Sequence, residues 1–184
     1  SILAHLVKNY DYWINKGISA ETCEYFKIGF ATKGQLQKRS VIPIFDKTIS
    51  NRIIGFSGRL VQYTKWHKQN GVAKWKHLGP SSQFLWPYDK NEKFDNVLLV
   101  ESPGCTIKLF EHDIKNTKCL FGTNISSTVM AYLITQNPKK ILIGTNNELY
   151  SEKSRQKKLK NSYYNFSTRK KFKLHYHTKR TLET

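Results

Sequence analysis

The chain is short of cysteine and of long apolar segments. Of its 184 residues only three are cysteines, Cys23, Cys105 and Cys119. They are far apart and form no Cys-x-x-Cys pair, which argues against a structural zinc site or a disulfide framework and favours a reducing compartment. No apolar run approaches the roughly 20 residues that a membrane-spanning helix needs, so an integral membrane protein is excluded. The first residues are also too few, and lack the basic flank, for a secretory signal.

Acidic residues are scarce as well. The sequence has 13 Asp and Glu against 31 Lys and Arg, which gives a formal net charge of +18. Such an excess favours a polyanionic partner, with nucleic acid first and an anionic membrane surface second. The densest basic region, 153–180, holds no acidic residue at all. We interpret this region as a phosphate-contacting face, with a solvated, solubilising surface as the alternative.

What the chain does have is enough apolar material for a core, since 39% of it is hydrophobic and 13% aromatic. In the first part, helical spacing of apolar residues predicts a helix over about 1–16, and Ser19 is placed to cap a second, short helix. Segments 40–45 and 52–60 read as an antiparallel hairpin. The basic and aromatic segment 61–80 is expected to be an exposed excursion.

The second part alternates strands with helices. Strands are predicted at about 97–101, 117–121, 140–144 and 171–177, with helices at 103–113, 126–136 and 151–161 between them. This order indicates βαβ units and a mostly parallel sheet. We therefore predict an α/β protein in two parts: a mixed α+β subdomain over 1–95, and a mostly parallel sheet flanked by helices over 96–184, with a basic C-terminal tail.

Two of the predicted parallel strands run into carboxylates. Apolar residues 97–100 lead into Glu101 and a Ser-Pro-Gly turn, and the strand 141–144 is followed by Asn146 and Glu148. The carboxyl ends of parallel strands meet at one sheet edge, where α/β folds place their chemistry. Two carboxylates at that edge could share a divalent metal.

A series of short segments keeps a characteristic order along the chain. The segments are Trp13-Ile-Asn-Lys-Gly-Ile-Ser-Ala-Glu-Thr, Phe26-Lys-Ile-Gly-Phe-Ala, Val41-Ile-Pro-Ile-Phe-Asp, Ile53-Ile-Gly-Phe-Ser-Gly-Arg59, Lys76-His-Leu-Gly-Pro-Ser, Leu98-Leu-Val-Glu101, Phe121-Gly-Thr-Asn-Ile-Ser and Asn146-Asn-Glu148. Together they resemble the catalytic core of bacterial-type DNA primases, above all those of bacteriophages. The second half then resembles the Toprim domain of that family, whose sheet is Rossmann-like.

The resemblance implies an enzyme, a DNA-directed RNA polymerase that makes short RNA primers on single-stranded DNA during DNA replication. Its partners would be the template, NTPs and a replicative helicase, in cis or in trans. It would act in the cytoplasm, of a bacterial host if phage-encoded. Glu101, Glu148 and Asn146 would be catalytic and would hold Mg²⁺ or Mn²⁺. Basic residues and one loop residue would face nucleotide or template: Lys38, Arg39, Arg59, Lys74, Lys76 and Thr123.

Several departures from the family pattern support a second hypothesis. Asn146 stands where the family has Asp, Cys105 replaces an acidic residue, and a Phe-x-Lys segment before the Toprim strand is missing. The family's zinc-binding and helicase segments are absent from the sequence as well. The alternative is a catalytically decayed Toprim module that serves as a nucleic-acid-binding structural component of a larger complex. A Toprim nuclease is a third hypothesis, against which the primase-like first half argues.

The remaining candidates each have a simpler interpretation. Each candidate cation can be a solvated surface charge, and the loop containing Thr123 can be a plain βα turn in which Ser126 caps the next helix. Trp66, Trp75 and Trp86 lie among Lys and His, so they can stack single-stranded bases or can simply pack.

Overall fold

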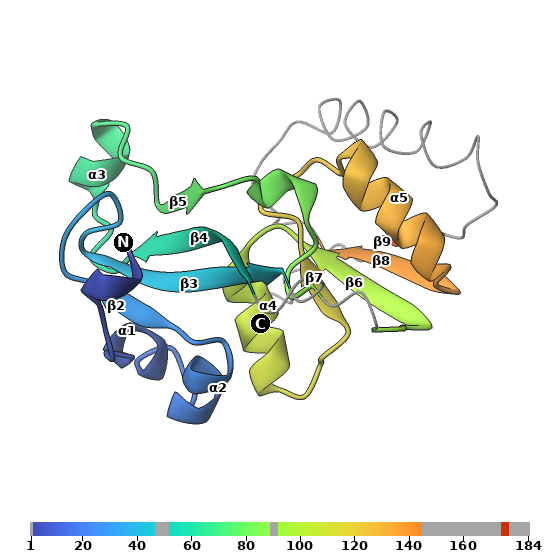
Figure 1. The fold of residues 1–184 in the computed structure, drawn as a ribbon, viewed down its shortest axis with the longest axis horizontal. Helices are drawn as coiled ribbons and strands as arrows, with labels where there is room; N and C mark the ends of the chain where they lie inside the picture. Colours follow the sequence, from blue (N-terminus) through green and yellow to red (C-terminus); the bar gives the residue numbers. More distant parts are fainter. Residues whose placement is uncertain (1, 47–51, 89–91, 145–173, 177–184) are drawn as a thin grey trace, which may run out of the picture. The chain divides into compact units, whose positions relative to one another are not determined.

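The computed structural model describes residues 2–46, 52–88, 92–144 and 174–176 (Figure 1). The chain divides into two compact units, each with its own β-sheet. The first unit comprises Ser1–Ser81, Pro87–Lys90 and Ile107–Asp113. The second comprises Ser82–Trp86, Asn91–Thr106 and Ile114–Thr184.

The first unit contains a five-stranded antiparallel sheet in the order β1-β2-β3-β4-β5. The predicted hairpin is confirmed, since its two segments pair antiparallel from Arg39 opposite Leu60 to Asp46 opposite Arg52. The strands are β1 (Leu6–Val7), β2 (Gly29–Ala31), β3 (Arg39–Asp46), β4 (Arg52–Leu60) and β5 (Trp75–Leu78).

Short helices complete this unit. The predicted cap of α2 (Ala20–Tyr25) is confirmed, because Ser19 Oγ accepts a hydrogen bond from the Thr22 N–H at 3.1 Å. The predicted helix over 1–16 is wrong: this segment forms a 3₁₀ turn, strand β1 and the one-turn helix α1 (Asp11–Ile14). Leu6 and Val7 pair with β2 instead. Long-range strand pairing thus overrides the local helical pattern.

The segment 61–80 is more ordered than the sequence predicts. It contains α3 (Lys65–Gln69), and it ends in β5, which pairs with β4 from Arg59 opposite Trp75 to Phe56 opposite Leu78. The expectation of an exposed excursion is therefore wrong for β5, whose four residues are all half-buried. It holds for α3, which has no buried residue.

One row of residues crosses the whole sheet of the first unit. Phe30 lies opposite Ser40, Ser40 opposite Arg59, and Arg59 opposite Trp75. Directly opposite residues of antiparallel strands point to the same face. Trp13 of α1 covers this face, where its Nε1–H donates to Ser40 Oγ at 2.7 Å. The other face carries a separate cluster of buried residues, namely Ala31, Leu36 and Val41.

The second unit contains a four-stranded parallel sheet in the order β7-β6-β8-β9. The described part confirms the predicted alternation of strands and helices, whereas the helix predicted over 151–161 lies outside the described residues. The elements in this part of the chain are β6 (Asn96–Val100), α4 (Pro103–Glu111), β7 (Thr117–Cys119), α5 (Ser127–Gln136), β8 (Lys140–Gly144) and β9 (Leu174–Tyr176). From Ile107 onward, α4 belongs to the first unit. The α/β fold class with a mixed first part and a Toprim-like parallel sheet is confirmed.

Helix α5 closes the core of the second unit. Its Val129, Met130 and Leu133 pack in one buried cluster with Val97 and Leu99 of β6, beneath the sheet face that α5 covers in Figure 1. The helix begins as predicted, because Ser126 Oγ accepts from the Val129 N–H at 3.2 Å. Its apolar side therefore faces the sheet and its polar side faces solvent.

Among the residues of this unit that the structure describes, one charged side chain is buried. Lys118 of β7 is 2% exposed, pairs with Glu92 and lies over the ring of Phe94. A buried ammonium needs such a partner, because desolvation without one is costly. Among the described residues, no helix has the length and apolarity to cross a membrane.

Candidate functional site

The second unit places Glu101 directly after the last residue of β6, at the carboxyl edge of the parallel sheet. Val100 lies opposite Gly144 of β8 on one side and opposite Cys119 of β7 on the other. Three strands thus end at the same level around Glu101, whose side chain is half-buried. This is the edge at which parallel α/β sheets hold their ligands.

Asn146 and Glu148 lie outside the described residues, so their predicted role stays a prediction. In the sequence, Glu148 follows the end of β8 by four residues, which can span at most about 14 Å of chain. In the ranges that the structure describes, no group of three or more His, Cys, Asp or Glu side chains could hold a metal. The predicted metal site depends on the two residues after β8.

The turn after Glu101 explains the position of Cys105. Ser102 precedes helix α4, and its Oγ accepts from the Cys105 N–H at 3.4 Å. The Ser102 hydroxyl in turn donates to Cys105 Sγ at 3.3 Å. The cysteine that replaces an acidic residue of the family is therefore part of a local helix-start network. It supplies no carboxylate oxygen at this edge.

Thr123 belongs to the loop that leaves the same sheet edge after β7. It is exposed, and Phe121 in this loop has a positive φ of 55°. The loop is anchored at its start, since the Phe121 N–H donates to the buried Cys119 Sγ at 3.2 Å. Burial raises the pKa of that thiol, so Cys119 stays protonated and is a packing residue.

In the first unit, Arg59 lies between two aromatic rings. Its Nε–H donates to the Tyr12 hydroxyl oxygen at 2.7 Å. Its guanidinium carbon is 5.6 Å from the centre of the Tyr12 ring and 5.8 Å from that of the Trp75 ring. Among the described residues its buried Nη1 has no hydrogen-bond partner. A guanidinium that retains an unused donor is suited to an incoming acceptor such as a phosphate.

Arg39 is buried, whereas the sequence predicts that it faces nucleotide or template. The residue is only 6% exposed, and its guanidinium donates to three backbone carbonyls, those of Gly58, Ala73 and Lys74, at 2.9–3.2 Å. Burial and the nearby charge of Arg59 lower its pKa. Arg39 therefore holds β4 and the start of β5 together, and we remove it from the candidate nucleic-acid contacts.

The three candidate lysines remain at the surface of the first unit to different degrees. Lys38 and Lys74 are exposed, and Lys76 on β5 is half-buried. Lys38 has a positive φ of 61° in the turn before β3. The Nζ of Lys74 lies 5.9 Å from the centre of the Tyr63 ring. Lys74 and Lys76 belong to a long stretch without acidic residues, because none occurs between Asp46 and Asp89.

The three tryptophans differ in their exposure to solvent. Trp66 on α3 is 61% exposed, and Lys65 and Lys68 lie next to it on the same short helix. Trp75 is half-buried under Arg59. Trp86 is 4% exposed, and its backbone pairs with that of Cys119, so the stacking role considered for it is wrong. Among the three, Trp66 offers the most open face to a base.

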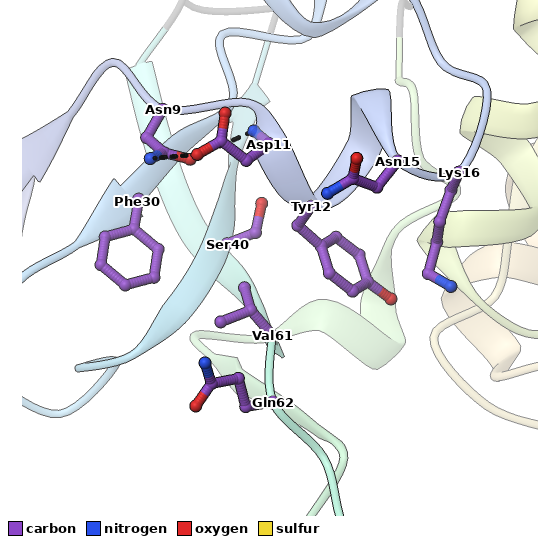
Figure 2. A pocket seen from close by; sticks show the side chains of 9 residues that line it. All are labelled: Asn9, Asp11, Tyr12, Asn15, Lys16, Phe30, Ser40, Val61 and Gln62. Carbon is purple, nitrogen blue, oxygen red and sulfur yellow. Dashed lines mark hydrogen bonds between the residues drawn. The ribbon is translucent and has the colours of Figure 1, made fainter.

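A pocket of about 500 Å³ opens on the same sheet face as Arg59 (Figure 2). Its nine lining residues come from the segment around α1, from strands β2 and β3, and from the two residues that follow β4. This pocket is not predicted by the sequence. Because strand pairing alone brings residues as distant as Asn9 and Gln62 together, no local pattern in the sequence marks it.

Comparison with known proteins identifies the fold. No family model matches the chain, and no curated protein sequence matches it. Among solved structures, a DnaG primase catalytic domain bound to ssDNA matches with a TM-score of 0.72 at 18% identity, over 94% of this chain and 64% of the other. A DNA primase domain from Pseudomonas aeruginosa matches with a TM-score of 0.71 at 20% identity, over 91% and 63%.

The primase fragment of the bacteriophage T7 primase-helicase protein also matches, with a TM-score of 0.60 at 16% identity, over 94% of this chain and 68% of that fragment. The chain therefore has the fold of the catalytic cores of DnaG-type primases, and the resemblance indicated by the sequence segments is confirmed at the level of the fold. The present chain spans less than two thirds of the length of the DnaG catalytic domain and of the Pseudomonas aeruginosa primase domain.

Proposed function

We propose that this chain is the polymerising core of a primase, which joins NTPs into short RNA primers on single-stranded DNA. The observation that carries the proposal is the position of Glu101. It ends the central strand β6 at the carboxyl edge of a parallel sheet, in a chain that has the primase-core fold. Glu148 and Asn146 follow the adjacent strand β8 in the sequence.

The donor set that the sequence provides after β6 and β8 would suit Mg²⁺ or Mn²⁺. Two carboxylates, Glu101 and Glu148, and the amide oxygen of Asn146 are hard oxygen ligands, and Mg²⁺ usually takes one or two carboxylates together with phosphate oxygens. When bound, the metal would neutralise charge on the nucleotide phosphates. Glu101 follows a well-packed strand, in which Val97 and Leu99 are fully buried on one face and Val100 is 5% exposed on the other.

The first unit supplies positive charge for the template and the nucleotide. Its exposed Lys38 and Lys74, with Arg59 between two rings, face a partner that carries phosphate. A single strand also presents unstacked bases, for which an exposed ring such as that of Trp66 is a platform. The matched DnaG domain was solved with ssDNA bound, which supports the same class of partner here. A replicative helicase partner and a bacteriophage setting remain part of this proposal.

The test is primer synthesis by the purified chain, with and without a replicative helicase, on a single-stranded template with Mg²⁺ and NTPs. We expect Glu101→Gln to lower the rate of NTP incorporation by at least about a hundredfold, since several kcal/mol of charge stabilisation depend on the bound metal. The amide keeps the size of the side chain and removes only its charge.

Glu21→Gln is the matched control, because Glu21 is an exposed glutamate in the first turn of α2. It should leave incorporation unchanged. Incorporation that persists in Glu101→Gln at the wild-type rate would exclude Glu101 from the reaction.

A second candidate function is a nucleic-acid-binding structural module without catalysis. The observation that favours it is Cys105, which takes part in the start of helix α4 and brings no carboxylate to the sheet edge. Asn146 in place of an acidic residue removes a further charge. Titration with Mn²⁺ separates the two functions. Binding that is lost in Glu148→Gln supports the polymerase, and the absence of binding at millimolar Mn²⁺ supports the structural module.

A further inference from the structure

We propose that the pocket of the first unit binds a nucleobase. The inference deepens the proposed function, on which it rests only for the choice of nucleic acid as the source of the base. The pocket has a volume of about 500 Å³ and lies on the face of the sheet that α1 covers. The aromatic and polar side chains that line the pocket suit a flat ring with hydrogen-bonding groups at its edge.

Two aromatic rings stand on opposite sides of the pocket. Figure 2 shows Phe30 at one side and Tyr12 at the other, with Ser40 and Val61 between them. Phe30 is half-buried on β2, and Tyr12 is held by the hydrogen bond from Arg59. Aromatic side chains stack on any base, because every base has a π-face. A planar ligand that enters between them therefore gains contact on both sides.

One hydroxyl group at the wall of the pocket is set to donate. Ser40 Oγ accepts from Trp13 Nε1. With this oxygen already serving as an acceptor, the hydroxyl proton is available for an acceptor on a ligand. Ser40 is 1% exposed, so a ligand acceptor that reaches it would be removed from water. Carbonyl oxygens and ring nitrogens of bases are acceptors of this kind.

The rest of the lining offers acceptors as well as donors. Asp11 is fixed by Asn9, whose Nδ2 donates to Asp11 Oδ2 at 3.1 Å and whose Oδ1 accepts from the Asp11 N–H at 3.1 Å (Figure 2). Its carboxylate can accept from an exocyclic amine and repels a bare anion. The amides of Asn15 and Gln62 add one donor and one acceptor group each. This mixture suits a base edge better than an inorganic phosphate.

A cation at the rim provides for the remainder of a nucleotide. The Nζ of Lys16 lies 5.3 Å from the centre of the Tyr12 ring, and Lys16 lines the pocket. An ammonium at the mouth can contact the phosphate that follows a bound base. The base can come from a free nucleotide or from a single strand, and the two sources share the chemistry described.

The indole N–H of Trp13 is a built-in reporter, because it donates to Ser40 Oγ at the wall of the pocket. We would record ¹H–¹⁵N spectra of the tryptophan indoles during titration with dAMP, dCMP, ribose 5-phosphate and a 12-nucleotide single strand, and assign Trp13 with Trp13→Phe. We expect base-containing ligands to shift the Trp13 signal and ribose 5-phosphate to leave it in place.

A shift with the mononucleotides identifies a free nucleotide as the source, and a shift with the oligonucleotide alone identifies a base within a strand. No Trp13 shift with any ligand, or an equal shift with ribose 5-phosphate, overturns the proposal. Phe30→Leu should weaken binding about fivefold or more by removing one stacking face. Gln62→Ala, at an exposed position, should weaken it about two- to tenfold. Gln69→Ala on α3 is the matched control.

The two proposals fail separately. The effect of Glu101→Gln on NTP incorporation tests the polymerase proposal, whatever the pocket of the first unit binds. A Trp13 shift in a chain without polymerase activity would leave the base-binding pocket intact.

Discussion

At the scale of single residues, Arg39 and Arg59 show how neighbouring positions on one sheet take different tasks. Arg39 is buried, and three of its hydrogen bonds go to backbone carbonyls. Arg59 is half-buried between Tyr12 and Trp75 and keeps a donor unused among the described residues. Gly58 permits this arrangement, because a Cβ there would lie 3.0 Å from Arg39 Cδ. The first arginine is structural, and the second can serve a ligand.

Arg39→Met should destabilise the first unit. The change removes the guanidinium donor from the carbonyls of Gly58, Ala73 and Lys74. The Lys74 carbonyl still accepts from the Leu60 N–H, and a buried carbonyl that is left unpaired costs about 1–3 kcal/mol. We expect the free energy of unfolding, measured by chemical denaturation, to fall by at least about 2 kcal/mol. Lys38→Met, at the exposed neighbour, should change it by less than about 0.5 kcal/mol. Equal effects of the two changes would contradict the structural role.

At the scale of elements, the edge strand β5 is the part of the first unit that the sequence describes least well. It approaches β4 so closely that a Cβ on Gly55 would lie 2.5 Å from the Leu78 carbonyl oxygen. Gly79, directly after β5, has a φ of +91°. Glycine at both positions lets the strand pair and then turn away.

Gly55→Ala should therefore weaken the pairing of β4 with β5. Backbone atoms cannot rotate out of the way as a side chain can, so we expect a loss of about 1–3 kcal/mol in the free energy of unfolding. Gly122→Ala is the matched control, because nothing lies within 4 Å of a Cβ at that position. If Gly55→Ala proved as stable as the control, the close approach of the two strands would be wrong.

β5 also carries a pH-sensitive group. His77 Nδ1 lies 2.9 Å from Ser57 Oγ, and burial lowers the pKa of His77 below its ordinary value near 6.5. As the pH falls through about 6.5, the unfolded chain takes up a proton that the folded chain resists. The free energy of unfolding should therefore decrease as the pH falls below about 6.5. The decrease should stop once the pH is below the pKa of His77 in the folded state.

Denaturation of wild type and His77→Gln between about pH 8 and 5 would measure this effect. The wild type should lose up to about 1.4 kcal/mol more per pH unit below pH 6.5, because one more proton is bound on unfolding. Other titrating groups contribute equally to both proteins. Parallel curves would contradict a neutral His77 in the folded state.

At the scale of the whole molecule, the net charge of +18 would contribute to every contact with a polyanion. Basic residues are spread over both halves of the sequence, in the acid-free stretches 47–88 and 153–180. A polyanion that follows such a surface displaces its own counterions, which makes the affinity depend steeply on salt.

We expect the logarithm of the association constant for a single-stranded oligonucleotide to fall linearly with the logarithm of the salt concentration. Each phosphate contact should contribute about −0.7 to the slope. Neutralising Lys65 and Lys68 beside Trp66 should reduce the slope by about 1.4 if both contact phosphate. Fluorescence anisotropy at several salt concentrations measures both slopes. An affinity independent of salt would contradict a nucleic-acid role for the charge.

Much of the fold could be predicted from local signals. The hairpin of β3 and β4, the cap of Ser19, the cap of Ser126 and the strand that ends in Glu101 all depend on residues close together in the sequence. Local apolar spacing and caps determine such elements. The order of the segments sufficed to indicate the primase-core fold.

The tertiary structure decided what depends on distant residues. It drew Leu6 and Val7 out of a helical pattern into β1, buried Arg39 under the backbone of the β5 segment, and joined Tyr12, Phe30 and Ser40 in one pocket. Strand pairing sets these neighbours, and it depends on hydrogen bonds between segments that no short window of sequence contains. The sequence alone thus determined which residue types are available for binding or catalysis. The pairing of the strands determined which of these residues lie next to one another in a candidate site.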